Sequence, residues 1–192
     1  MVKTKLAIMA SGTGSNFLAI MEKITQENWP IEITRLVVDH ADANVINYAN
    51  QFNVPVLVVD YHDGKKETEA KIIRQLQADK VSGIVLAGYM RILSAEFISH
   101  YPNRILNIHP ALLPSFPGRH GIQDAYDYGV KVTGVTIHFV DATVDGGQIV
   151  AQSPVDIYDN ETVEHLEPRI HEVEHRLYPT TIQNLVQRGV FQ

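Results

Sequence analysis

The 192-residue sequence contains no cysteine, which excludes a disulfide framework, a thiolate nucleophile and a cysteine-ligated zinc site. It has no basic run longer than Lys65-Lys66, and 22 acidic residues outnumber 16 basic ones, giving a formal net charge of −6. Nucleic-acid binding through an extended basic surface is therefore not expected. No apolar stretch approaches the roughly 20 residues of a membrane helix, and the N-terminal apolar run is too short for a signal peptide. These absences predict a cytoplasmic chain that binds no membrane.

Short apolar runs alternate with longer amphipathic segments along most of the chain, a pattern typical of βαβ units around a mainly parallel sheet. The length and the hydrophobic content of 45% favour one domain spanning residues 1–192. We predict strands at 5–10, 31–38, 55–59, 82–88 and 104–108, and helices at 16–27, 42–53, 64–79 and 94–100. The sequence therefore predicts the α/β class with a doubly wound layout.

The pattern changes after residue 130. Two longer strand-like stretches, 132–140 and 147–156, are joined through Asp145-Gly146-Gly147 and indicate an antiparallel edge to the sheet. Pro168 and Pro179 would each remove an amide donor from a helix interior, so we expect two or three short helices at the C-terminus.

A glycine turn, Ser11-Gly12-Thr13-Gly14-Ser15-Asn16, stands where the first strand passes into the first helix. Free backbone N–H groups at the positive end of a helix favour an anion such as phosphate. Phe17 occupies the place of the third glycine of a dinucleotide fingerprint, although Asp39 after the second strand could supply its ribose-binding acid, and no Gly-Lys-Ser/Thr follows. The anion contacts would be Gly12, Gly14, Ser15 and Asn16. A plain βα turn without a ligand is equally consistent with this stretch.

Asn107 and His109 lie two residues apart on one face of the fifth strand, at its carboxyl end, where open parallel sheets bind ligands. In acyl transfer an amide stabilises a developing oxyanion while an imidazole handles the proton. The loop between the last two strands could bring the carboxylate of Asp145 close to His109. This negative charge would raise the pKa of the ring above about 6.5. A structural histidine and an ordinary Asp-Gly turn are the alternatives. We assign no role to His62, His100 or His165.

Four segments, in this order and spacing, resemble the folate-dependent formyltransferases, and among them those that act on phosphoribosylglycinamide. They are Ser11–Asn16, Gly88–Leu93, the Asn-x-His-Pro-x-Leu-Leu-Pro-x-Phe-Pro-Gly segment at 107–118, and Asp145–Gly147, and the resemblance continues to Glu174–Pro179. It implies a Rossmann-like formyltransferase fold. It also implies transfer of the formyl group of 10-formyltetrahydrofolate, as co-substrate, to the glycinamide amine of 5′-phosphoribosylglycinamide in de novo purine biosynthesis.

The resemblance also implies which residues act, without any metal, in a monomer or homodimer. Asn107, His109 and Asp145 would be catalytic, and Gly14, Ser15, Asn16, His171 and Glu174 would bind the ribonucleotide. The folate would contact Lys65, Met90, Arg91, Ile92, Leu93, Asn107, Asp141, Ala142, Thr143, Val144 and Asp145. Three places depart from the family pattern: Lys65 replaces an arginine, His171 replaces a glutamine, and Asp39-His40 replaces Asn-Lys or Asn-Arg.

Two other functions are consistent with parts of the sequence. A formyltetrahydrofolate hydrolase resembles the family in the His-Pro loop and the Asp segment, but it usually has an N-terminal regulatory domain, for which the residues before Ser11 leave no room, and it lacks the Gly-Ser-Asn turn. A non-catalytic nucleotide-binding module would explain the fold and the glycine turn. It would leave Asn107, His109 and Asp145 without a purpose.

Overall fold

The computed structural model describes residues 2–192. Its elements in chain order are β1 (Thr4–Ala10), α1 (Ser15–Gln26), β2 (Ile31–Val38), α2 (Val45–Gln51), β3 (Val56–Val58), the short 3₁₀ helix η1 (Tyr61–Asp63), α3 (Lys65–Ala78), β4 (Gly83–Leu86), α4 (Ala95–His100), β5 (Ile105–His109), α5 (Gly121–Tyr128), β6 (Val132–Phe139), β7 (Ile149–Asp156) and α6 (Val163–Gln187).

The seven strands form one sheet in the order β3-β2-β1-β4-β5-β6-β7. The pairs from β3 to β5 are parallel, whereas β6 runs antiparallel to both β5 and β7. The predicted doubly wound fold with an antiparallel C-terminal edge is confirmed. The chain winds outward in one direction through β1, β2 and β3 and returns through β4 and β5, so the order reverses between β1 and β4, where such sheets bind ligands.

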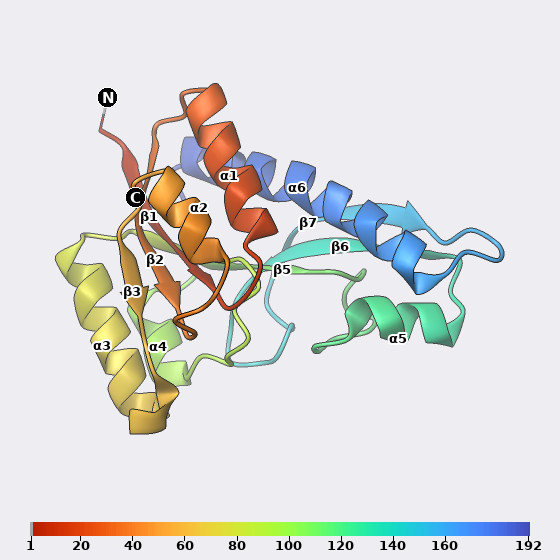
Figure 1. Cartoon of the computed structure of the whole chain (residues 1–192), viewed down its shortest axis with the longest axis horizontal. Coiled ribbons are helices and arrows are strands. Elements are labelled where there is room, and N and C mark those ends of the chain that lie inside the picture. The colour runs from red at the N-terminus through yellow and green to blue at the C-terminus, as the bar shows by residue number, and fades with distance from the viewer. Residues whose placement is uncertain (1) are drawn as a thin grey trace.

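Helices cover both faces of the sheet (Figure 1). One buried cluster joins the sheet to α1, α2 and α6, and a second joins the opposite face to α3 and α4. Residues 6–10 of β1 are all fully buried, because alternate side chains such as Leu6 and Ala7 enter opposite clusters. This burial on both faces explains the continuous apolar run of the central strand.

The expected division of the C-terminal region into short helices is wrong. Pro168 and Pro179 lie inside one 25-residue helix, α6, which runs along the sheet (Figure 1). An interior proline costs about 3 kcal/mol. Burial of a large apolar side chain contributes about 1.5–3 kcal/mol, and α6 buries Leu166, Ile170 and Ile182 almost completely, with further apolar residues in the same stripe. The packing of the whole stripe therefore outweighs the two lost amide donors.

Most other differences from the predicted elements are shifts of one to three residues at their ends. The helix α5, which follows the proline-rich loop, was not predicted. Its buried Ala125 and the partly buried Ile122 and Tyr126 recur at helical spacing. A helix of eight residues spans only about two turns, so this periodicity is too brief to be recognised in the sequence. Within residues 2–192, no helix combines the length and the apolar character that crossing a bilayer requires.

Candidate active site

A cleft of about 620 Å³ opens at the carboxyl ends of β1, β4 and β5, between the β6–β7 loop and α6. Its volume is in the range of small-molecule sites. The predicted residues that line it come from segments far apart in the sequence: Gly12, Gly14, Ser15, Asn16, Met90, Arg91, Ile92, Leu93, Asn107, His109, Asp141, Ala142, Thr143, Val144, Asp145, His171 and Glu174. The structure thus brings the glycine turn and the His109–Asp145 pair to one cleft.

The glycine turn is shaped by close backbone contacts. Gly14 has φ +82°, and a Cβ atom there would lie 2.6 Å from the Val45 side chain, so a larger residue would be both strained and obstructed. The Val45 amide donates to the Gly12 carbonyl (3.2 Å), which attaches the turn to α2. The first turn of α1 therefore faces the cleft with its amide donors in a fixed arrangement, as binding of an anion requires.

Glu174 connects the start of α1 to α6. Its Oε2 atom accepts hydrogen bonds from Asn16 Nδ2 (3.1 Å) and from His171 Nδ1 (2.9 Å), although only 4% of the residue is exposed. The hydrogen bond and charge of Glu174 raise the pKa of His171 above its ordinary value. Asn16 Oδ1 is buried and has no hydrogen-bond partner among residues 2–192, so an acceptor at this position remains available to a ligand.

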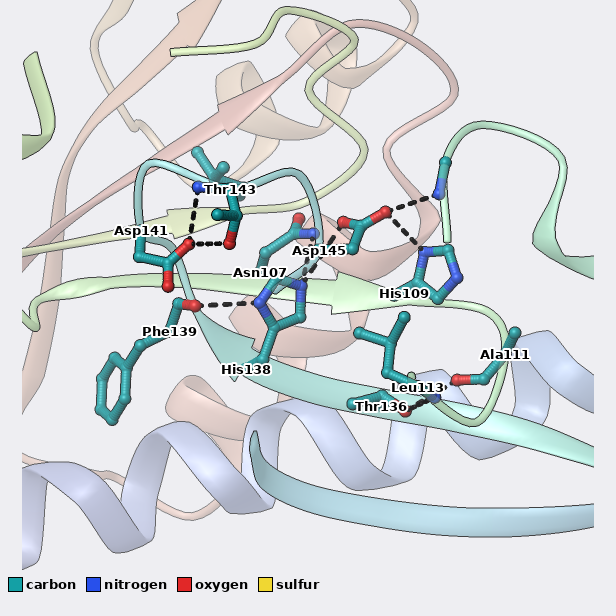
Figure 2. Close-up of polar contacts among 12 residues, drawn as sticks. Asn107, His109, Ala111, Leu113, Thr136, His138, Phe139, Asp141, Thr143 and Asp145 are labelled. Carbon is teal, nitrogen blue, oxygen red and sulfur yellow. Dashed lines mark hydrogen bonds and ion pairs between the residues drawn. The ribbon is translucent and has the colours of Figure 1, made fainter. Parts of the chain in front are cut away.

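Asp145 lies between two imidazoles (Figure 2). Its Oδ2 atom is 3.6 Å from His109 Nδ1, and its Oδ1 atom is 3.6 Å from His138 Nε2. Oδ2 also accepts a hydrogen bond from the Gly118 amide (2.7 Å). The contact with His138 is the largest influence on Asp145 and lowers the pKa of its carboxyl group, so the carboxylate is negatively charged near neutral pH.

The loop after β5 is fixed to β6 by Thr136 (Figure 2). The Thr136 hydroxyl donates to the Ala111 carbonyl (2.7 Å) and accepts from the Leu113 amide (3.0 Å). Further along the loop, the Phe116 carbonyl accepts a hydrogen bond from His109 Nε2 (2.7 Å). Phe116 has φ +54°, which is rare for a bulky residue. The loop therefore orients the His109 ring from one side while Asp145 faces it from the other.

The wall formed by Met90–Leu93 is attached to two neighbouring loops. The Met90 amide donates to Ser11 Oγ (2.8 Å), and Arg91 Nε donates to Asp39 Oδ2 (2.6 Å). The Asp39 side chain is fully buried, and Asp39 does not line the cleft. The suggestion that Asp39 serves as a ribose-binding acid is wrong, because its carboxylate is engaged by Arg91 beneath the surface.

Lys65 is the one predicted binding residue that lies elsewhere. It begins α3, which follows the edge strand β3, and it lines a separate hollow of about 200 Å³ together with Lys66 and Glu69. Lys65 is exposed and lies outside the main cleft.

The comparisons with known proteins agree with this geometry. The model of the family described as formyl transferase matches residues 4–182. The chain belongs to this family. It is 42% identical over 184 residues to a phosphoribosylglycinamide formyltransferase of Bacillus subtilis, covering 95% of this chain and 94% of the relative. The crystal structure of a phosphoribosylglycinamide formyltransferase from Bacillus halodurans is 41% identical, with a TM-score of 0.93 and 97% of each chain covered. The structure of a glycinamide ribonucleotide transformylase from Geobacillus kaustophilus is 44% identical, with a TM-score of 0.92, and the match covers 95% of this chain and 98% of that one.

The protonation of His109 differs from the sequence expectation for this formyl transferase. Burial is the largest influence and lowers the pKa of the ring, although the Phe116 carbonyl and Asp145 both act to raise it. The expected net increase in the pKa of His109 is therefore wrong. The neutral ring carries its proton on Nε2, where it donates to Phe116, and Nδ1 faces Asp145 without a proton. Asp145 is placed to stabilise the imidazolium once the ring gains a second proton.

His138 lines the cleft although the sequence did not single it out. It lies directly across the antiparallel ladder from Asn107, and the two side chains meet at 3.1 Å between Asn107 Nδ2 and His138 Nε2. Because His138 Nδ1 donates to the Phe139 carbonyl (2.9 Å), Nε2 of the neutral ring is an acceptor and holds the amide nitrogen of Asn107. The signal in the sequence was the polar pair Thr136 and His138, at alternate positions of a strand in which Thr133 is the one other polar side chain.

Proposed function

We propose that this protein transfers the formyl group of 10-formyltetrahydrofolate to the glycinamide amine of 5′-phosphoribosylglycinamide, a step of de novo purine biosynthesis. The observation that carries the proposal is the single cleft that joins a helix N-terminus suited to phosphate with Asn107, His109 and Asp145. The names of its relatives, phosphoribosylglycinamide formyltransferases, support the same reaction.

The ribonucleotide binds at the α1 end of the cleft. Its phosphate accepts hydrogen bonds from the backbone of Gly14, Ser15 and Asn16, and its ribose hydroxyls face Glu174 and His171. A carboxylate such as Glu174 accepts hydrogen bonds from hydroxyl groups, and Asn16 Oδ1, which has no partner within residues 2–192, provides a second acceptor nearby.

The folate lies along Met90–Leu93 and Asp141–Asp145. Met90, Ile92 and Val144 expose more than half of their surface at this end of the cleft, and apolar side chains of this kind suit an aromatic ring system. The formyl group then points toward Asn107. In this proposal Lys65 has no direct contact with the folate ring.

The glycinamide amine attacks the formyl carbon, and the oxyanion that forms is stabilised by the Asn107 amide and by His109. The growing negative charge offsets the burial that lowers the pKa of His109, so the ring takes up the proton that the attacking amine loses as the intermediate forms and holds it until the folate nitrogen departs. Asp145 stabilises the resulting imidazolium across 3.6 Å. The proton lost by the amine finally reaches the departing folate nitrogen, and the formyl carbon–nitrogen bond to folate breaks. These are the roles of general acid–base catalysis and oxyanion stabilisation.

The deciding experiment follows the loss of the formyl group from 10-formyltetrahydrofolate with and without phosphoribosylglycinamide. Deformylation that requires the ribonucleotide supports the transferase, whereas equal deformylation without it identifies a hydrolase. The His109→Ala variant is expected to lower kcat far more than it raises either KM. Unchanged turnover in this variant would remove His109 from the mechanism.

The remaining parts of the proposal concern the setting of the enzyme. A chain without cysteine suits the reducing cytoplasm, where the proposed substrates are small soluble molecules. The enzyme acts as a monomer or a homodimer. Sedimentation of the purified protein distinguishes these two states.

A further inference from the structure

The anion-binding end of the cleft contains a buried negative charge. Glu174 accepts a hydrogen bond from Asn16, which lies in the first turn of α1, the same turn whose amides face the cleft. A phosphorylated ligand at this helix N-terminus therefore lies near a carboxylate with 6% of its side chain exposed, where solvent screens poorly. Such a carboxylate opposes binding of a phosphate unless a positive charge compensates it.

His171 is placed to supply this charge. Its Nδ1 atom donates to Glu174 Oε2 at 2.9 Å, and its Nε2 atom is 3.6 Å from Glu167 Oε1. The His171 side chain is 41% exposed and lines the cleft. The neutral and the protonated ring both make the hydrogen bond to Glu174, but only the protonated ring cancels its charge.

The surroundings of His171 favour the protonated ring. Glu174 and Glu167 on α6 both act to raise its pKa, and burial acts in the opposite direction. The ring of His175 stacks on it at 6.4 Å, and burial lowers the pKa of His175, so this neighbour stays neutral more readily. The helix α1 packs against α6. On α1, the uncharged Asn16 faces Glu174, and the negative charge of Glu22 acts to raise the pKa of His175.

We infer that His171 is the charge-compensating residue of the ribonucleotide site, and that its imidazolium cancels Glu174 so that the ligand phosphate binds more tightly. This inference rests on the proposed function. Because the pKa of His171 is raised, the positive charge is present below that pKa and is lost as the pH rises through it. Ribonucleotide affinity should therefore fall with rising pH, and binding should in turn raise the proton affinity of the ring.

The test compares the parent protein with His171→Gln. Glutamine keeps an N–H donor for Glu174 but cannot be protonated. Calorimetry gives Kd for phosphoribosylglycinamide between pH 6 and 9, and the ratio of the two Kd values removes the titration of the ligand itself, which both proteins share. We expect the variant to bind about 5- to 30-fold more weakly at pH 6 and the ratio to approach one at pH 9. His165→Gln, an exposed change on the same helix outside the cleft, should leave the ratio at one throughout.

Two further measurements separate the possible outcomes. The unphosphorylated riboside should show a ratio independent of pH, whereas the same pH dependence without the phosphate would overturn the inference. In the parent protein, the NMR titration midpoint of His171 should rise on ribonucleotide binding, and an unchanged midpoint would overturn it without any variant. If the parent protein binds no ribonucleotide at any pH, the proposed function fails. Tight binding with a constant Kd ratio refutes only the role of His171.

Discussion

Replacing Asp145 with asparagine tests the electrostatic part of the mechanism most directly. The side chain keeps its size and an oxygen that can accept from the Gly118 amide, which now bonds Oδ2 at 2.7 Å. What it loses is the negative charge 3.6 Å from His109 Nδ1. Asp145→Asn therefore removes the group that stabilises the imidazolium while leaving most of the packing unchanged.

The size of the effect follows from the distance. Two unit charges 3.6 Å apart interact by about 4–5 kcal/mol at an effective dielectric constant of 20, and the His109 side chain is only 4% exposed, so water screens little. The imidazolium is only partly formed in the transition state, so part of this energy is lost. Since each 1.36 kcal/mol corresponds to a tenfold rate change, we expect kcat to fall by about 100- to 1000-fold, with both KM values within about threefold.

The assay records the absorbance change as 10-formyltetrahydrofolate is deformylated at saturating ribonucleotide. The NMR titration midpoint of His109, already lowered by burial, should move to still lower pH in the variant. Asp159→Asn provides a matched control, because Asp159 is 85% exposed and pairs with Lys131 at the surface. A kcat within threefold of the parent value, together with an unmoved His109 midpoint, would refute the proposed role of Asp145.

Three other substitutions test how the site and the fold are held. Gly121→Ala places a methyl group 2.9 Å from His109 Nε2 and should lower kcat at least about tenfold by displacing the ring; full activity would contradict this contact. Thr136→Val removes the hydroxyl that binds the loop after β5, and urea denaturation should show a loss of about 1–3 kcal/mol, against no loss if the loop amide finds another acceptor. Two hydrogen bonds from Arg35 are the largest influence on Asp79 and lower its pKa, so their stabilisation is present above about pH 4 and is lost as the pH falls through the lowered pKa. Asp79→Asn should therefore cost about 1.5–3 kcal/mol at pH 7 and progressively less as the pH falls below 4, and a cost independent of pH would disprove this assignment.

The central architecture could be predicted from the sequence because each buried strand is an apolar run between turn residues. The positions that the sequence misjudged depend on tertiary packing. Pro168 and Pro179 each favour the end of a helix locally. The buried apolar residues of α6 pack against the sheet, however, and this packing stabilises one continuous helix. The helix α5 is only eight residues long, too short for its periodicity to distinguish it from the preceding loop.

The members of the candidate site were largely predictable, whereas their charges and partners were not. Asn107 and His109 were singled out by their positions at the end of a strand, the resemblance to the formyltransferases added Asp145, and all three line the cleft. The pKa of His109 depends on how deeply the ring is buried, which no local pattern reveals. His138 reaches Asn107 only because β5 and β6 pair in one register, which brings together residues 31 positions apart.

Asp145 is held in place by contacts of the protein itself, and this decides how its charge acts. It has φ +52°, a left-handed conformation that aspartate tolerates better than most residues. The Gly118 amide fixes Oδ2 of Asp145. A Cβ atom at Gly147 would collide with the Phe139 carbonyl, so only glycine at this position lets the β6–β7 loop pack this closely against the end of β6. A charge fixed in this way does not need to reorient when an imidazolium forms beside it, and avoiding that reorganisation is the main advantage of an enzyme over water in stabilising charge. The rate lost in Asp145→Asn should therefore measure this charge more than a rearrangement of the loop.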